Sequence, residues 1–240
     1  MRKLMLLSGP SCVGKGPLLK ALKQFCPDIQ SREIPVIRSH ESRNGKPRAN
    51  EVRIWDNPHY FMPAAEILKL SRKDYFVGDC RGLPQAIDTR KMADTKEDVV
   101  LLEVYHAFGA DFREWAVANL PSLPFRTVFV TPFSEEEITW LSMAGVAATD
   151  YVRDVMIEKQ LLRARFMGRT SLAAAEIGDI RNRAADAFSE MQSARFYTDV
   201  IVNHDGEGHS NWHMEPDGSF ASEPEGDAGR TLQKLYEIVR

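Results

Sequence analysis

The stretch "LLSGPSCVGKGPLLKAL", residues Leu6–Leu22, decides the fold. An apolar run over Lys3–Ser8 leads into its first glycine, and leucines recur at helical spacing over Lys15–Phe25. A short apolar run that ends at glycines is typical of a buried strand, and apolar residues three and four apart are typical of an amphipathic helix. The stretch therefore predicts a strand, a glycine-rich turn and a helix, in that order.

The glycine-rich turn has the spacing of a phosphate-binding loop, with Gly9, four residues, Gly14 and then Lys15. Glycines let backbone N–H groups converge on phosphate oxygens, and the helix N-terminus adds partial positive charge. The lysine supplies a mobile cation for the β- and γ-phosphates. The alternative is a plain surface turn, but the strand before and the helix after favour a site for ATP and Mg²⁺. Its expected nucleotide contacts are Gly9, Ser11, Gly14, Lys15 and Gly16.

The residue after the lysine departs from the loop pattern. The pattern places a Ser or Thr there, whose hydroxyl faces Mg²⁺, whereas this chain has Gly16 followed by Pro17. Proline is tolerated in the first helical turn, because an N–H there has no intrahelical partner. Since Mg²⁺ keeps several of its waters, we expect the missing hydroxyl to weaken metal binding without abolishing it.

Strand and helix patterns alternate along the rest of the chain. A helix is predicted from Ser134, which has capping-box spacing to Glu137, and another over about 173–194. Apolar, β-branched runs predict further buried strands at "DVVLLEVY" (Asp98–Tyr105), "RTVFVT" (Arg126–Thr131) and "TDVIVN" (Thr198–Asn203). This order predicts an α/β fold of the P-loop NTPase type, three layers (α/β/α) around a mostly parallel central sheet.

Composition limits the classes of partner and compartment. The 240 residues are 43% hydrophobic and 27% charged, with a net charge of −3, so nothing attracts the chain as a whole to nucleic acid or an anionic membrane. Its apolar runs fall short of the roughly 20 residues that span a bilayer. Three irregularly spaced cysteines indicate a reducing, cytoplasmic location rather than a disulfide framework: Cys12, Cys26 and Cys80. The oligomeric state stays open.

The order of motifs along nearly the whole chain resembles the guanylate kinase family of nucleoside monophosphate kinases. "SGPSCVGKG" is similar to that family's phosphate loop, and "SHESR…PRANE" (Ser39–Glu51) is similar to its nucleotide-acceptor motif. "LLEVYHAFG" (Leu101–Gly109), "RFMGRT" (Arg165–Thr170) and "VIVNHD" follow in the family's order. The resemblance implies a single domain with a core (1–36, 79–150 and 186–240), an acceptor-binding subdomain (37–78) and a lid (151–185).

The resemblance also implies roles for individual residues. The expected catalytic set is Lys15, Arg43, Arg48, Arg165, Arg169 and Arg183, since arginine pairs bidentately with phosphate and phosphoryl transfer depends on positioning and charge. Asn203 is expected near the adenine, and Glu103 near Mg²⁺. The expected acceptor-binding residues are Ser39, Arg43, Arg48, Glu51, Tyr60, Gly78 and Glu103.

The acceptor motif departs from the family more than the loop does. Two extra residues separate Arg43 from Arg48, and Glu41 stands where the family has a threonine. Leu68 stands where a guanine-reading glutamate is expected. The resemblance makes GMP the leading acceptor, and because of these departures another nucleotide or a sugar phosphate is close behind. The alternatives to a kinase are a catalytically weak binding module and a switch that hydrolyses ATP slowly.

The segment 203–229 has the composition of an exposed loop. It holds seven acidic residues and three histidines but no Lys or Arg, and "EPDGS" within it suggests a hairpin turn. We expect an exposed excursion here. His209 and His213 could bind a metal ion, but a solvated loop is the favoured interpretation.

Overall fold

The computed structural model describes residues 3–43, 45–47, 49–93 and 96–240. The chain forms two compact units. The first contains the chain up to Leu7 together with Gln30–Arg126, and the second contains Ser8–Ile29 and Thr127–Arg240. The predicted division into core, acceptor-binding subdomain and lid stays a prediction.

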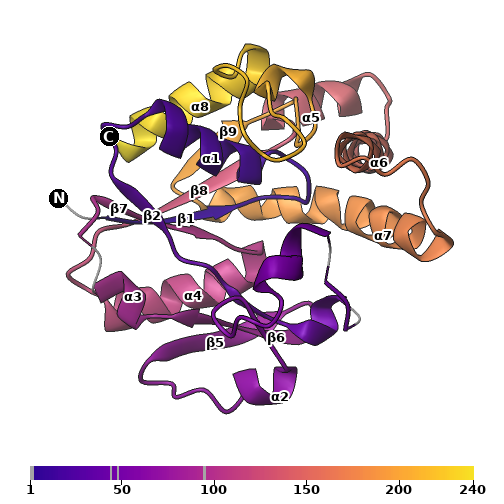
Figure 1. The fold of residues 1–240 in the computed structure, drawn as a ribbon. Helices are drawn as coiled ribbons and strands as arrows, with labels where there is room; N and C mark the ends of the chain where they lie inside the picture. Colours follow the sequence, from indigo (N-terminus) through magenta and orange to yellow (C-terminus); the bar gives the residue numbers. More distant parts are fainter. Residues whose placement is uncertain (1–2, 44, 48, 94–95) are drawn as a thin grey trace. The chain divides into compact units, whose positions relative to one another are not determined.

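The larger sheet is mostly parallel, which confirms the predicted α/β class. Its pairings β1–β7, β2–β7 and β8–β9 are all parallel. The strands at the predicted places are buried apolar runs, such as Leu4–Leu7 in β1. In the first unit the spatial order is β2 (Ser31–Glu33), β7 (Val99–Glu103) and β1 (Lys3–Ser8), and in the second β8 (Phe125–Thr131) lies beside β9 (Asp199–Val202) (Figure 1).

A smaller sheet belongs to the first unit. A two-residue turn joins two of its strands, and both turn residues, Arg81 and Gly82, have positive φ (56° and 79°), as a twisted hairpin requires. Its strand order is β4 (Phe61–Met62), β3 (Ile37–Ser39), β6 (Leu83–Asp88) and β5 (Tyr75–Cys80). The sheet thus continues to Asp88, ten positions past the expected end of the acceptor-binding subdomain at 78.

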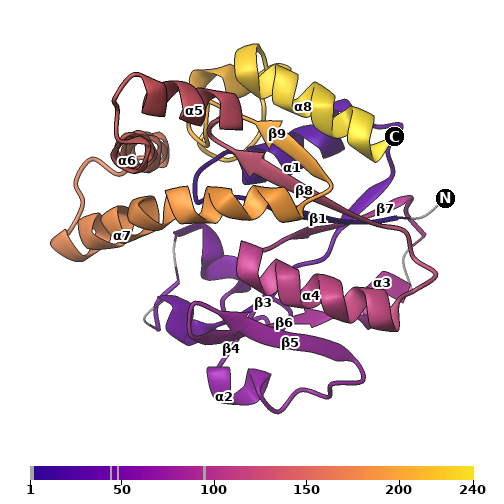
Figure 2. The same ribbon diagram turned by 180° about the vertical axis from the view of Figure 1, so that it is seen from behind.

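Each face of this small sheet packs on a helix of its own unit. On one face, Ile37 and Ala86 form a buried cluster with Ile67 of α2 (Ala64–Ile67). On the other lies α4 (His106–Asn119) (Figure 2). The Phe76 ring meets that of Phe108 in this helix edge to face, with ring centres 5.3 Å apart. This packing fixes the strand that leads into the acceptor motif.

Helices follow the strands in both units. The first unit also contains α3 (Arg90–Ala93) and two 3₁₀ turns, η1 (His40–Arg43) and η2 (Ala49–Ile54). No helix within the described ranges is both long enough and apolar enough to cross a membrane. The second unit contains α1 (Lys15–Phe25), α5 (Glu135–Met143), α6 (Ala148–Phe166), α7 (Ala174–Met191), η3 (Gln192–Phe196), η4 (Ser210–Trp212) and α8 (Gly226–Val239).

Two helix pairs build the second unit. The α1 and α8 helices lie side by side (Figure 1). Each buries a leucine stripe, including Leu18 in α1 and Leu235 in α8. The helix α8 was not predicted from the sequence. The α6 and α7 helices pack on each other through a cluster that includes Val152, Met156 and Ala187.

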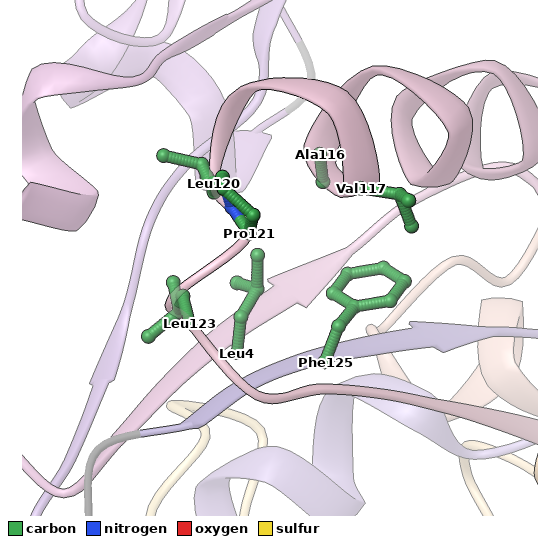
Figure 3. Close-up of a pocket in the computed structure, with 7 residues that line it drawn as sticks. All are labelled: Leu4, Ala116, Val117, Leu120, Pro121, Leu123 and Phe125. Atoms are coloured by element: carbon green, nitrogen blue, oxygen red, sulfur yellow. The ribbon is translucent and has the colours of Figure 1, made fainter.

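A cavity of about 210 Å³ lies in the first unit, at the end of α4 and beside the start of β1 (Figure 3). Its lining side chains are all apolar: Leu4, Ala116, Val117, Leu120, Pro121, Leu123 and Phe125. Ligand sites combine apolar walls with a few placed polar groups. This cavity has no such side chains, so it is not a candidate site.

The capping box of α5 supports a stability prediction. Ser134 Oγ accepts a hydrogen bond from Glu137 N (3.1 Å), and Glu137 Oε2 accepts one from Ser134 N (2.7 Å). Ser134→Ala should lower the free energy of unfolding by about 1 kcal/mol, because a helix N–H loses its acceptor. Urea unfolding measures it. The control is Ser142→Ala in the same helix, whose hydroxyl only bonds back to Ile138 O; an equal loss in both variants would contradict the capping role.

Candidate functional site

The loop between β1 and α1 requires glycine at both pattern positions. Gly9 has φ of +147°, and a Cβ there would stand 2.1 Å from Val130 O. Gly14 has φ of +100°, and a Cβ there would stand 2.3 Å from Asn203 Nδ2. Other residues cannot adopt these conformations at such separations. The glycines are therefore needed for the loop geometry itself, as the pattern predicted.

Lys15 is folded back over the loop. Its Nζ donates to Gly9 O and Pro10 O, both at 2.8 Å, and the residue is only 6% exposed. The helix begins at Lys15, with Leu18 N donating to Gly14 O, and it accommodates the buried Pro17 in its first turn as expected. The loop, the helix N-terminus and the lysine together fit the phosphates of a nucleotide.

Cys12 lies within the loop, and nearby charges affect the pKa of its thiol. Its φ of +66° is unusual for a side-chain-bearing residue. Burial, with a smaller contribution from the nearby Glu207 carboxylate, raises the pKa of the Cys12 thiol to about 11. The cations Arg163, Arg183 and Lys15 act in the opposite direction on that pKa. The loop thus has cations from three elements close by, and one carboxylate.

The segment after β9 packs against this loop, so the expectation of an exposed excursion over 203–229 is wrong for its first half. Asn203 is fully buried, and its Nδ2 donates to Val13 O at 2.7 Å. Glu207 N donates to Cys12 O at 3.0 Å. Because backbone and amide groups make these contacts, the acidic composition gave no sign of them.

A buried tryptophan and an aspartate hold this segment in place. Trp212 is 1% exposed, and its Nε1 donates to Gly206 O at 2.6 Å. Asp205 Oδ2 accepts from Ala228 N at 2.8 Å, in the first turn of α8. The segment is therefore fixed both to itself and to the start of α8.

The second half of the segment is the turn that the sequence predicted. Met214 and Phe220 form an antiparallel bridge, and Glu215 N donates to Ser219 O. The two histidines contact different carboxylates: His209 Nδ1 lies 3.4 Å from Asp205 Oδ1, and His213 Nε2 lies 3.3 Å from a carboxylate oxygen of Glu225. They do not converge on one point.

The arginines of α6 and α7 differ in their surroundings. Arg163, which the sequence did not predict, pairs its Nε with Glu207 Oε2 at 2.6 Å beside the loop. Arg183 Nε donates to Asp179 Oδ1 at 3.0 Å. Of the other two predicted lid residues, Arg165 is exposed, and Arg169 pairs with Glu176 at 3.0 Å.

On the acceptor side, Arg43 is held by Glu51. Its Nε lies 3.0 Å from both carboxylate oxygens and its Nη2 lies 2.9 Å from one of them, with both side chains largely buried. Ser39 is fully buried, and its hydroxyl has no hydrogen-bond partner among the described residues. Arg48 lies outside the described residues. The structure thus brings Arg43 and Glu51 together as a largely buried ion pair.

The remaining acceptor residues have local roles in the described structure. Gly78 lies in β5, where a Cβ would come within 3.2 Å of the Phe108 ring, and Tyr60 accepts from Arg38 N through its carbonyl. Glu103 ends β7, in register with Leu7 of β1. Glu41, which replaces a family threonine, accepts from Ala64 N at the start of α2. Their predicted substrate and metal roles stay predictions.

Across the described residues, no three His, Cys, Asp or Glu side chains are grouped so as to hold a metal ion. Mg²⁺ does not need such a group, because it keeps several waters and binds through one or two carboxylates together with nucleotide phosphates. A single carboxylate beside the phosphate loop fits that requirement.

Comparison with solved structures identifies the fold. A guanylate kinase from Anaplasma phagocytophilum matches with a TM-score of 0.51 and 16% identity, over 100% of this chain and 85% of that one. The chain has the same α/β fold as that protein. A shikimate kinase from Bacteroides thetaiotaomicron also matches, with a TM-score of 0.40 and 15% identity, over 99% of this chain and 98% of that one. No family model and no curated protein sequence matches the chain.

Lys159 of α6 is buried near the loop and supports a prediction on pH. Its Nζ donates to His204 O, and burial lowers its pKa to about 8, while Asp205 and Asp227, together with Cys12, partly oppose that shift. The unfolded chain keeps the proton up to about pH 10.5. Between these values the unfolded state binds more protons, so stability rises with pH.

Lys159→Met should remove this rise. The difference in unfolding free energy between wild type and variant should change by about 2–3 kcal/mol between pH 8 and 10.5, in favour of the wild type at high pH. Urea unfolding across that range measures it. The control is Lys234→Met, which replaces an exposed lysine. Parallel pH curves for wild type and Lys159→Met would contradict a lowered pKa of Lys159 in the folded state.

Proposed function

We propose that the chain is an ATP-dependent kinase that transfers a phosphoryl group to a phosphate-bearing small molecule. The observation that carries this is the loop of the second unit, whose two required glycines and folded-back Lys15 support its use as a phosphate cradle. The resemblance of the motif order makes GMP the leading acceptor. Another nucleotide and a sugar phosphate are the next candidates, since the acceptor motif departs most from the family.

The donor side would act mainly through charge. Loop amides and Lys15 would hold the β- and γ-phosphates, and Arg163 and Arg183 would neutralise charge that develops on the transferred group. Mg²⁺, when bound with ATP, supplies further neutralisation of the phosphates. Lys15 and Arg183 have protein partners in the described structure, and ATP would replace those partners with phosphate oxygens, whereas Arg163 would keep its contact with Glu207.

The acceptor side would act mainly through orientation. The Glu51 carboxylate holds the Arg43 guanidinium in one orientation, and such a fork suits bidentate contact with a phosphate. The Ser39 hydroxyl is buried among the described residues with no partner, which supports a polar ligand atom or a water beside it. Arg48 and Glu103 complete the proposed set.

A binding module that has lost catalysis is the alternative, and the departures in the acceptor motif favour it. ATP affinity separates the two proposals, because a module would have no use for the donor loop. Calorimetry that detects ATP binding dependent on Lys15 would argue for the kinase.

Lys15→Ala should abolish phosphoryl transfer, because the cation that faces the β- and γ-phosphates is removed. The assay is ADP release coupled to a reporter, run with Mg²⁺ over a panel of nucleoside monophosphates and sugar phosphates. Lys23→Ala, an exposed lysine in the same helix, is the matched control and should keep activity. If the wild type turned over no acceptor in the panel, with Mg²⁺ or with Mn²⁺, the kinase proposal would fail.

Arg43→Ala should raise the KM for the acceptor tenfold or more while leaving the KM for ATP nearly unchanged, because a bidentate phosphate contact is lost. Steady-state kinetics with the best acceptor of the panel measures both constants. Arg53→Ala, an exposed arginine of the same unit, is the control. An unchanged acceptor KM would show that the acceptor phosphate binds elsewhere.

A further inference from the structure

A carboxylate lies beside the position where the loop lacks its hydroxyl. Glu207 Oε1 is 3.9 Å from the point where a Cβ on Gly16 would stand. Gly16 occupies the place of the Ser or Thr that faces Mg²⁺ in such loops. A residue from a distant part of the chain thus brings an oxygen to the place where the loop itself offers none.

The backbone of Glu207 is fixed against the loop. Its N–H donates to Cys12 O at 3.0 Å, and the preceding Gly206 approaches the same carbonyl so closely that a Cβ there would stand 2.9 Å away. The Trp212 indole donates to Gly206 O at 2.6 Å. These contacts hold the Glu207 backbone beside the loop, and the Glu207 side chain is only 17% exposed.

The carboxylate is oriented and has the right separation for a shared ion. Arg163 Nε holds its Oε2 at 2.6 Å. Two oxygen ligands of one octahedral Mg²⁺ lie roughly 3–4 Å apart, given bonds of about 2.0–2.1 Å. A Ser or Thr hydroxyl oxygen would stand one bond from the Cβ position that lies 3.9 Å from Oε1, so rotamers exist in which the two oxygens have that separation. Oε1 can therefore serve an ion that the missing hydroxyl would have faced.

We propose that Glu207 replaces the loop Ser/Thr as the protein's ligand to the Mg²⁺ that accompanies ATP, directly or through one water. This inference rests on the proposed ATP site. One carboxylate suffices, because Mg²⁺ in nucleotide sites takes its other ligands from phosphates and water. The segment after β9 thus completes a loop that is incomplete in its own sequence.

The test is the affinity of the whole protein for ATP, measured by calorimetry with Mg²⁺ and with EDTA. The wild type should bind ATP more tightly with Mg²⁺ than without it. Glu207→Gln should reduce that gain tenfold or more and leave the EDTA affinity equal or higher, because a carboxylate near the phosphates is lost. Glu215→Gln, from the exposed turn of the same segment, should behave as the wild type.

A second variant restores the pattern residue. Gly16 has room for a side chain, since its nearest neighbour to a Cβ is Glu207 Oε1 itself. Gly16→Ser added to Glu207→Gln should recover most of the Mg²⁺ gain, which a merely structural role of Glu207 would not allow.

Three other results of these titrations would overturn the inference. A gain from Mg²⁺ that is equal in wild type and Glu207→Gln would overturn this inference and leave the proposed ATP site standing. If Glu207→Gln bound ATP more tightly than the wild type, and by the same factor with Mg²⁺ and with EDTA, the inference would be overturned in favour of a carboxylate that competes with the phosphates. A wild type that binds no ATP in either condition would overturn the proposed function, and this inference with it.

Discussion

The hydrogen bonds from the segment after β9 to the carbonyls of the phosphate loop are the constraint on which the site depends. Asn203 Nδ2 donates to Val13 O and Glu207 N donates to Cys12 O, so two consecutive peptide groups of the loop are fixed from outside. A loop with two glycines at positive φ has many other conformations open to it. These contacts hold the conformation that surrounds a phosphate, and they bring Glu207 to the loop.

The charges around the loop are balanced within the protein. Lys15 bonds to loop carbonyls, Arg163 to Glu207 and Arg183 to Asp179. A nucleotide would have to replace the partners of Lys15 and Arg183, so its affinity would reflect the difference between phosphate contacts and the contacts given up. Burial of Lys159 near the same loop lowers its pKa and so reduces the free energy of unfolding at pH values where the unfolded chain keeps the proton. Part of the stability is thus given up where the phosphates are proposed to bind.

Sequence reasoning succeeded where contacts are local and failed where they are distant. The strand β1, the loop glycines and the helix α1 follow from residues within one short stretch, and the α5 capping box follows from Ser134 and Glu137 alone. The contacts of Asn203 and Glu207 join parts of the chain far apart in sequence, and an acidic stretch without Lys or Arg gives no sign of burial. Leucines at helical spacing near the C-terminus could have revealed α8, yet nothing local could have paired Arg163 with Glu207.

The most direct test of the phosphate site is a crystal structure with Mg²⁺ and a non-hydrolysable ATP analogue. The account predicts the β- and γ-phosphates on the backbone amides between Gly9 and Gly16, with Lys15 Nζ moved from the Gly9 and Pro10 carbonyls onto a phosphate oxygen. A nucleotide bound elsewhere, with Lys15 still bonded to those two carbonyls, would contradict it.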